Sequence, residues 1–332
     1  MWAEDLRLVP RDANKTPFVV AHEFFDALPI HIFQSVPPPP KEESNTVQTP
    51  TGPIQPQRRQ PVGNQWREMM VSPKPPHRLA ENDSEFELTL SRGASAHSMY
   101  LPETSSRYQA AKGTDGATIE ISPESQAFAR DIAVRMGGSN PEDQASATQP
   151  PSRIQGRKVP SAPKELPLRK DTPSGAALFI DYGPAQTIPT NSLRGIKSHT
   201  RLSPLTSPGT TDISADVDFI ALAESAINAS PGVEVHGPVD QAGFLTAMGI
   251  EERAAQLVKQ AVDKERGGST GLEKGELTEL VKRIEGGWKR LVDRSSQGMG
   301  SLYQVMAIVP FVTPKAGEAK RRPVGFGGDV SI

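Results

Sequence analysis

The sequence predicts an α/β protein with a parallel sheet, and two short apolar runs are the main observations behind this prediction. Residues 18–21 (FVVA) and 176–180 (AALFI) contain no polar side chain, which is typical of strands buried on both faces of a parallel sheet. Acidic residues follow both runs: Glu23 and Asp26 follow the first, and Asp181 follows the second. Because ligands bind at the carboxyl ends of strands in open α/β sheets, these three carboxylates are the first candidates for chemistry.

Local patterns predict the other elements. Residues 66–71 and 86–90 are β-type runs separated by a Pro-rich loop and predict a hairpin, whereas the small, polar residues 91–117 indicate a surface excursion. Ser122-Pro123 supplies an N-cap and a first helical residue for a helix that ends at Gly137-Gly138. The remaining predicted elements are extended segments at 28–33, 119–121, 233–235 and 303–309, a helix entered through Asp218, a short helix over 240–248, and amphipathic helices with apolar stripes at 254–261 and 277–284.

Three stretches rich in Pro or Gly interrupt or end this pattern. Disordered insertions are predicted at about residues 37–64 and 140–174, with a disordered tail over 313–332, so that residues 1–312 form one partial domain. Residues 184–208 have no periodicity and predict a long loop with a positively charged centre. The loop is either an ordinary charged surface segment or a lid that contacts an anionic ligand or an acidic partner. Its basic residues are Arg194, Lys197, His199 and Arg201.

The composition excludes several classes of protein. A net charge of -2 gives no reason to expect a nucleic-acid partner, and the lack of cysteine excludes disulfides, thiolate catalysis and Cys-ligated metal. No apolar run approaches the roughly 18 residues of a membrane span. The first residues include Glu4, Asp5 and Asp12, so no transit peptide is visible.

Motif spacing narrows the chemistry further. The six histidines show neither H-x-x-H nor H-E-x-x-H spacing, so no metal site is predicted. There is no glycine-rich nucleotide loop between a strand and a helix, and no G-x-S-x-G motif. Glu23 and Asp26 could act as a pair of carboxylates, as in a glycosidase, or could simply cap a turn.

The sequence contains six blocks, which read AHEFFDALPIHIFQ, ISPESQAFARDIAVRMGG, ALFIDYG, SLRGIKSHTRLSPLTSPGTTDISADVDF, HGPVDQAGFLTAMGIEER and GMGSLYQVMAIVP. Together these blocks resemble a known family, the MidA-like S-adenosylmethionine-dependent methyltransferases. This family includes a mitochondrial protein arginine methyltransferase that assists complex I assembly. The blocks occur in the family's order between about residues 2 and 310, and the two Pro-rich insertions are not part of its pattern.

The resemblance implies a fold, a cofactor and partners. The fold is a Rossmann-like class I methyltransferase sheet with an added hairpin and C-terminal helices. The cofactor is S-adenosylmethionine, the protein substrate is a complex I subunit, and the compartment is the mitochondrion. In the family, the first strand and its acidic glycine-rich cofactor loop precede the segment that resembles residues 2–10, so we expect a sheet incomplete at its N-terminus and weak cofactor binding. The alternative is a non-catalytic interaction or scaffold protein derived from this fold.

The resemblance also implies a catalytic role for the carboxylates. Glu23 and Asp26 lie in the block that follows the fourth strand of the family's sheet. A planar guanidinium ion pairs bidentately with a carboxylate, and methyl transfer needs one of its nitrogens held in line with the methyl group. We therefore expect Glu23 first, Asp26 second and Asp181 third as catalytic residues, with no cofactor-binding residue assigned.

Overall fold

A computed structural model describes residues 2–38, 47–49, 52–54, 63–79, 84–141, 167–198, 200–266, 274–314 and 322–327. The chain divides into two compact units. Unit 1 comprises Met1–Asp26, Glu124–Thr187 and Val217–Ile332, and unit 2 comprises Ala27–Pro123 and Ile188–Asp216. The sequence predicted one domain over residues 1–312, whereas the two internal segments of unit 2 form sheets of their own.

Unit 1 contains the sheet that carries the predicted carboxylates. Its strand order is β1 (Phe18–His22), β8 (Ala176–Tyr182), β13 (Tyr303–Pro310) and β12 (Val233–Asp240). β1 and β8 pair in parallel, and β13 runs antiparallel to both β8 and β12. The predicted parallel pair is therefore confirmed, and the carboxyl ends of β1 and β8 meet at the same edge of the sheet.

β1 is not buried on both faces, contrary to the sequence prediction. Phe18 and Val20 are 79% and 73% exposed, whereas Ala21 is buried. The reason is position, because β1 is an edge strand of the described sheet and has a neighbouring strand on one flank only. The core lies deeper, around the fully buried side chains of Phe179, Val305 and Met306.

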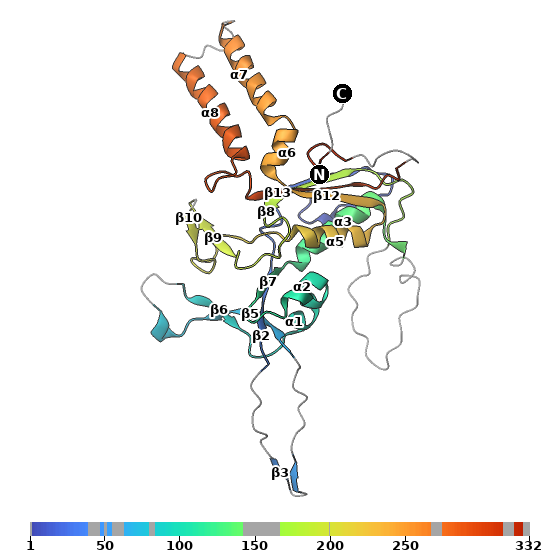
Figure 1. Ribbon diagram of the computed structural model, residues 1–332, viewed down its shortest axis with the longest axis vertical. Helices are drawn as coiled ribbons and strands as arrows, with labels where there is room; N and C mark the ends of the chain where they lie inside the picture. Colours follow the sequence, from blue (N-terminus) through green and yellow to red (C-terminus); the bar gives the residue numbers. More distant parts are fainter. Residues whose placement is uncertain are drawn as a thin grey trace. The chain divides into compact units, whose positions relative to one another are not determined.

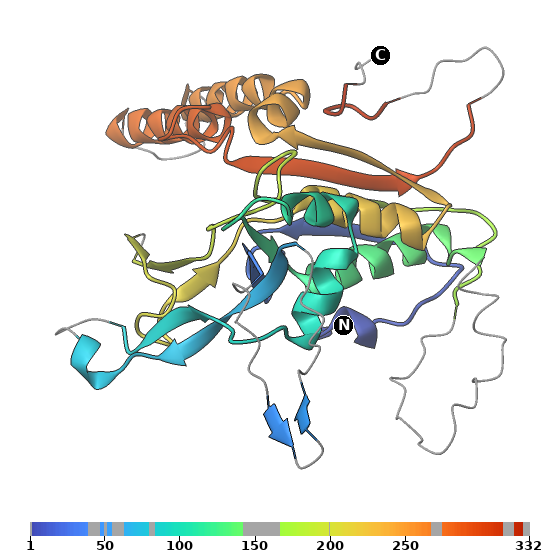
Figure 2. The ribbon, with the colours of Figure 1, turned by 60° about the horizontal axis from the view of Figure 1, so that its bottom comes forward.

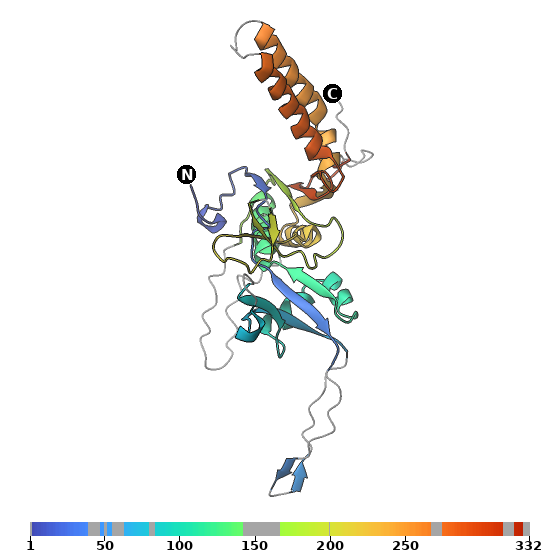
Figure 3. The same ribbon diagram turned by 90° about the vertical axis from the view of Figure 1, so that its left-hand side faces the viewer.

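The helices of unit 1 begin where the sequence supplies caps. α5 (Phe219–Ala229) starts after Asp218, whose Oδ1 accepts the Ala221 N–H at 3.1 Å. Figure 2 shows α3 and α5 running alongside the strands of the sheet. Figures 1 and 3 show α7 and α8 side by side as a helical hairpin. The bounds are η1 Leu6–Leu8, α3 Pro123–Gly137, α6 Gln241–Ala247, α7 Ile250–Arg266 and α8 Lys274–Val292.

Unit 2 is built on an antiparallel sheet of order β6-β5-β2-β7. Its β5–β6 pair confirms the predicted hairpin. The predicted surface excursion instead contains two short helices, α1 and α2, because Tyr108 on α2 is fully buried and anchors this segment. The bounds are β2 His31–Val36, β3 Val47–Thr49, β4 Gly52–Ile54, β5 Gln65–Pro73, η2 Pro76–Arg78, β6 Phe86–Leu90, α1 Ala96–Tyr100, η3 Leu101–Glu103, α2 Ser106–Ala111 and β7 Thr118–Ile121.

The predicted positive loop is wrong as a loop, because it contains two strands of a second sheet in unit 2. β9 (Arg194–Lys197) pairs with β10 (Thr200–Leu202) and β11 (Asp212–Ser214). Arg194 forms an ion pair with Asp216, with Nη1 at 2.6 Å from Oδ1. His199 lies outside the described residues, and the lid hypothesis stays a prediction.

Most of the predicted insertions and tail also lie outside the described residues. Residues 167–174 are described and attach to the neighbourhood of α3, through Leu168 N–H to Ser139 Oγ at 2.8 Å and Ser174 N–H to Met136 O at 3.0 Å. Among the helices in the described ranges, none combines the length and apolar character that crossing a membrane requires.

Candidate functional site

Glu23 follows β1 directly and occupies an unusual backbone conformation. Its N–H donates to Ile180 O at 3.1 Å, which extends the pairing of β1 with β8 by one residue. Its φ of 48° lies in the left-handed region, where residues other than Gly and Asn are uncommon. Glu23 is also exposed to solvent. The chain thus turns sharply at the strand end and presents a carboxylate to solvent.

Two tyrosines hold this carboxylate. Tyr303 and Tyr182 are cross-strand partners in the β13–β8 register, so their side chains lie on the same face of the sheet. Tyr303 Oη donates to Glu23 Oε1 and lies 2.5 Å from Tyr182 Oη. A hydroxyl has one proton to donate, which leaves Tyr182 to donate in the second bond. We call Glu23, Tyr182 and Tyr303 the tyrosine–glutamate cluster.

The tyrosine–glutamate cluster has a permanent donor. Tyr303 is 1% exposed, and this burial raises the pKa of its phenol, with further raising contributions from the hydrogen bonds to Glu23 and Tyr182. The phenol therefore stays protonated and keeps donating to the Glu23 carboxylate throughout the physiological pH range.

Replacing Tyr303 by Phe is expected to lower the free energy of unfolding by about 1–2 kcal/mol, because the variant loses a hydrogen bond to a charged group while its ring still packs. Tyr100→Phe provides a control, because Tyr100 is 70% exposed and should not change stability. Urea unfolding of both variants measures the difference. Equal stabilities of the two variants would contradict a role for the Tyr303 hydroxyl.

Asp181 supports the loop that carries Glu23. Its side chain is fully buried, and its Oδ2 accepts the N–H groups of Phe24 at 3.1 Å and Phe25 at 2.9 Å. Its Oδ1 accepts the N–H of Tyr182 at 2.9 Å. Asp26, which is half-buried, approaches Asp181 Oδ2 with its own N–H at 3.4 Å. Asp181 therefore meets backbone rather than solvent, which is the geometry of a positioning residue.

Burial and the nearby Asp26 charge raise the pKa of Asp181 from 3.8 to about 7, against the lowering effect of the backbone N–H groups. Between these two values the folded protein keeps a proton that the unfolded chain has lost. The unfolded state then binds fewer protons, so stability falls as the pH rises from about 4 to about 7.

This pH dependence is expected to disappear in Asp181→Asn, which cannot titrate. Urea unfolding at about pH 5 and about pH 7.5 should show the wild type losing roughly 2–3 kcal/mol more stability than the variant between the two conditions. The same change in both proteins would show that Asp181 is not the responsible group.

A pocket of about 490 Å³ opens beside Glu23 within unit 1. Three of its lining residues are acidic, Glu4, Asp5 and Glu23, of which Asp5 is paired with Arg7, and among the described residues that line it none is Lys or Arg. Such a pocket favours a cationic ligand. The other lining residues are Ala3, Leu6, Val9, Val19, Val20, Ala21, His22, Phe24, Phe128 and Ile132. We call this hollow the acidic pocket.

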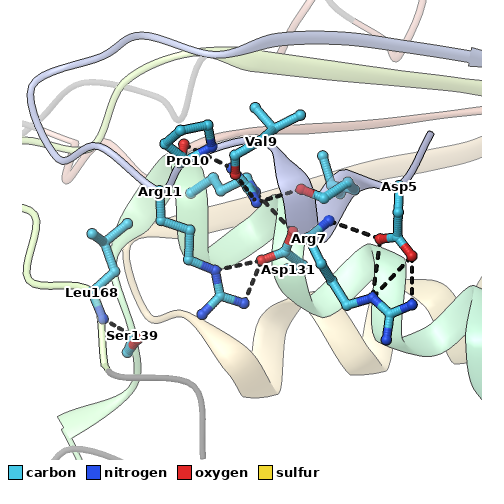
Figure 4. A network of polar contacts seen from close by, with 10 residues as sticks. Asp5, Arg7, Val9, Pro10, Arg11, Asp131, Ser139 and Leu168 are labelled. Carbon is cyan, nitrogen blue, oxygen red and sulfur yellow. Dashed lines mark hydrogen bonds and ion pairs between the residues drawn. The ribbon is translucent and has the colours of Figure 1, made fainter. Parts of the chain in front are cut away.

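One wall of the acidic pocket is tied to α3 by a buried arginine, next to the contacts of Asp5, Arg11 and Asp131 that Figure 4 shows. The Arg135 Nη2 donates to Leu6 O and Val9 O, both at 2.9 Å, and its Nε donates to Asp131 Oδ2 at 2.7 Å. Asp131 also accepts from Arg11 Nε at 2.7 Å. Because a guanidinium group has five donors in a rigid plane, it can fix several carbonyls of one segment at once.

The structure thus separates the three predicted site residues. Glu23 lines the acidic pocket, whereas Asp26 is not among its lining residues and Asp181 lies beneath the loop. The sequence analysis missed Tyr182 and Tyr303, although a tyrosine directly after Asp181 and one at the start of the last predicted strand were visible signals. The turn before α6 and the turn before α3 hold no glycine-rich segment, so neither provides a cofactor loop.

Comparisons with known proteins agree with the predicted fold. Residues 1–239 match the model of the family described as "Putative S-adenosyl-L-methionine-dependent methyltransferase". A Burkholderia thailandensis crystal structure described as a "likely methyl transferase", bound to S-adenosyl-homocysteine, is 19% identical with a TM-score of 0.53 and covers 99% of this chain and 57% of that one. The predicted methyltransferase-type α/β fold is confirmed.

Relatives with names of their own match most of the chain. The rat "Protein arginine methyltransferase NDUFAF7, mitochondrial" is 26% identical over 309 residues, which are 93% of this chain and 49% of the relative. The Drosophila melanogaster homolog of the same name is 25% identical over 315 residues, covering 94% and 50%. The chain therefore spans about half the length of the curated relatives that it matches.

Proposed function

Because this chain belongs to that S-adenosyl-L-methionine-dependent methyltransferase family, we propose that it forms the acceptor side of a protein arginine methyltransferase active site. S-adenosylmethionine is the cofactor of the family and supplies an electrophilic methyl group. The acceptor proposed here is an arginine side chain of a protein, which is the specificity in the names of the rat and Drosophila relatives.

The observation that carries this proposal is the exposed Glu23 carboxylate in the acidic pocket. An arginine guanidinium carries a positive charge at all physiological pH values and forms its strongest pairs with carboxylates. The phenol of Tyr303 occupies one edge of the Glu23 carboxylate and fixes its orientation. In this proposal, the second oxygen of the carboxylate receives the incoming cation from the pocket that Glu23 lines.

In this proposal, Glu23 acts mainly by positioning. Its carboxylate holds the guanidinium so that one nitrogen is directed at the methyl group and localises the positive charge on the other nitrogens. When bound, the cofactor would supply the methyl group and leave as a neutral thioether, and the methylated guanidinium would release one proton to water. Asp181 contributes by fixing residues 24–26, and Asp26 acts on the charge state of Asp181.

The partner and compartment belong to the same proposal. The relatives are named as mitochondrial, which supports a mitochondrial location for this protein. The resemblance found in the sequence further suggests a complex I subunit as the protein substrate. Both statements can be examined by locating the tagged full chain in cells and by identifying the proteins that lose methylarginine when it is removed.

The test of the reaction is methyl transfer from methyl-labelled S-adenosylmethionine to proteins of a mitochondrial extract. The cofactor is supplied up to millimolar concentration so that its binding does not limit the reaction. Mass spectrometry of the labelled proteins should find methylarginine. Label on another residue type would contradict arginine specificity, and no label above a chain-free control would favour the scaffold alternative.

A further inference from the structure

A second cluster of ionisable side chains lies in unit 2 and shares no residue with the site described above. Glu68 on β5 pairs with Phe33 in the β2–β5 register, so His31, two residues along β2, lies on the same face as Glu68. His97 on α1 completes the group. Each residue offers one ligand atom, and these atoms all lie within 4.8 Å of one another. We call these residues the histidine–glutamate cluster.

The two histidines approach the same carboxylate oxygen. His31 Nδ1 lies 2.7 Å from Glu68 Oε1, and His97 Nδ1 lies 3.5 Å from it. The two imidazole ring centroids are 4.2 Å apart. Two imidazole nitrogens and one carboxylate oxygen therefore lie close enough together for one ion to contact all three.

The other Glu68 oxygen is fixed by a supporting residue. Ser95 Oγ donates to Glu68 Oε2, and Ser95 is itself held by a capping box with Ser98 at the start of α1. Outer contacts of this kind orient the ligands of metal sites.

We propose that His31, Glu68 and His97 bind a divalent transition metal ion, with Zn²⁺ as the ion that suits them best. Zinc binds imidazole nitrogen and carboxylate oxygen at about 2.0–2.2 Å, so its tetrahedral ligand atoms lie about 3.3–3.5 Å apart. The distance of 3.5 Å from His97 Nδ1 to Glu68 Oε1 already fits this spacing. The distance of 2.7 Å from His31 Nδ1 to the same oxygen would lengthen when the ion binds.

The cluster also has an entry path and an open coordination position. Glu68 and His31 side chains are 8% and 26% exposed, whereas that of His97 is 57% exposed. The ion therefore enters from the His97 side. With three protein ligands, the fourth position of a tetrahedral ion remains for water. The bound ion would link β2, β5 and α1 within unit 2.

The experiment is calorimetric titration of the full chain with Zn²⁺, together with the absorption spectrum of the chain with Co²⁺. We expect one Zn²⁺ per chain, visible bands of tetrahedral Co²⁺, and a rise in the melting temperature of the wild type with Zn²⁺. His97→Gln should weaken Zn²⁺ affinity at least about tenfold, since even loss of an outer partner costs that much.

His77→Gln is the matched control, because His77 on η2 is an exposed histidine outside the cluster and its loss should leave affinity unchanged. His31→Gln, checked for folding by circular dichroism, provides a second ligand variant. The proposal fails if the wild type and His97→Gln bind Zn²⁺ equally, or if the wild type shows no Co²⁺ bands. Either result would leave the cluster as a hydrogen-bonded group without metal.

Discussion

Replacement of Glu23 by Gln is expected to lower the rate of methyl transfer to protein arginine by about 10²–10³-fold. The amide has nearly the same shape, but it carries no charge and directs two donors toward a ligand that itself only donates. Removing one well-placed group that interacts with charge in a transition state typically costs this much. Initial rates with methyl-labelled S-adenosylmethionine and the same protein substrate measure the effect.

Glu251→Gln provides the matched control for this substitution. Glu251 is an exposed residue at the start of α7 in the same unit, and it does not line the acidic pocket. Its replacement changes the net charge of the chain identically. If both variants lose activity to the same degree, net charge rather than the site is responsible; if neither loses any, Glu23 does not hold the acceptor.

Asp181→Ala is expected to reduce the free energy of unfolding by about 2–5 kcal/mol. The substitution leaves the N–H groups of Phe24, Phe25 and Tyr182 without their acceptor, and each buried donor left unpaired costs about 1–3 kcal/mol. Asp181→Asn should cost less, because its carbonyl oxygen still accepts. Urea unfolding followed by circular dichroism compares the variants.

Asp171→Ala controls for the loss of a carboxylate from unit 1. The Asp171 side chain is 87% exposed, so this variant should unfold at the urea concentration of the wild type. An Asp181→Ala variant as stable as Asp171→Ala would show that the loop after β1 does not depend on Asp181. It would also remove the structural reason for assigning Asp181 a positioning role.

The sequence was sufficient to predict the parallel strand pair of unit 1 and the sheet edge at which the carboxyl ends of both strands meet. An all-apolar run followed by an acid marks a strand of a parallel sheet, and β1 and β8 are such strands, paired in parallel. The exposure of Phe18 and Val20 could not be predicted, because an apolar run shows that a strand is suited to burial but does not show which other elements pack against it.

The partners of the predicted carboxylates depend on tertiary register. Tyr303 follows Tyr182 by 121 residues, and only the pairing of β13 with β8 brings their hydroxyls together beside Glu23. The same limit applies to the histidine–glutamate cluster, whose members come from two strands and a helix. Motif spacing detects ligands that lie on one helix or loop, but it cannot detect ligands that come from elements distant in the sequence.

The most direct test of the account is a crystal structure of the chain with an arginine-containing peptide. The account predicts the guanidinium group in the acidic pocket, with its nitrogens about 2.7–2.9 Å from the Glu23 carboxylate oxygens, the spacing of a charge-assisted hydrogen bond. Tyr303 should keep its contact with the same carboxylate. A guanidinium group bound away from Glu23, with the acidic pocket filled by water alone, would contradict the account.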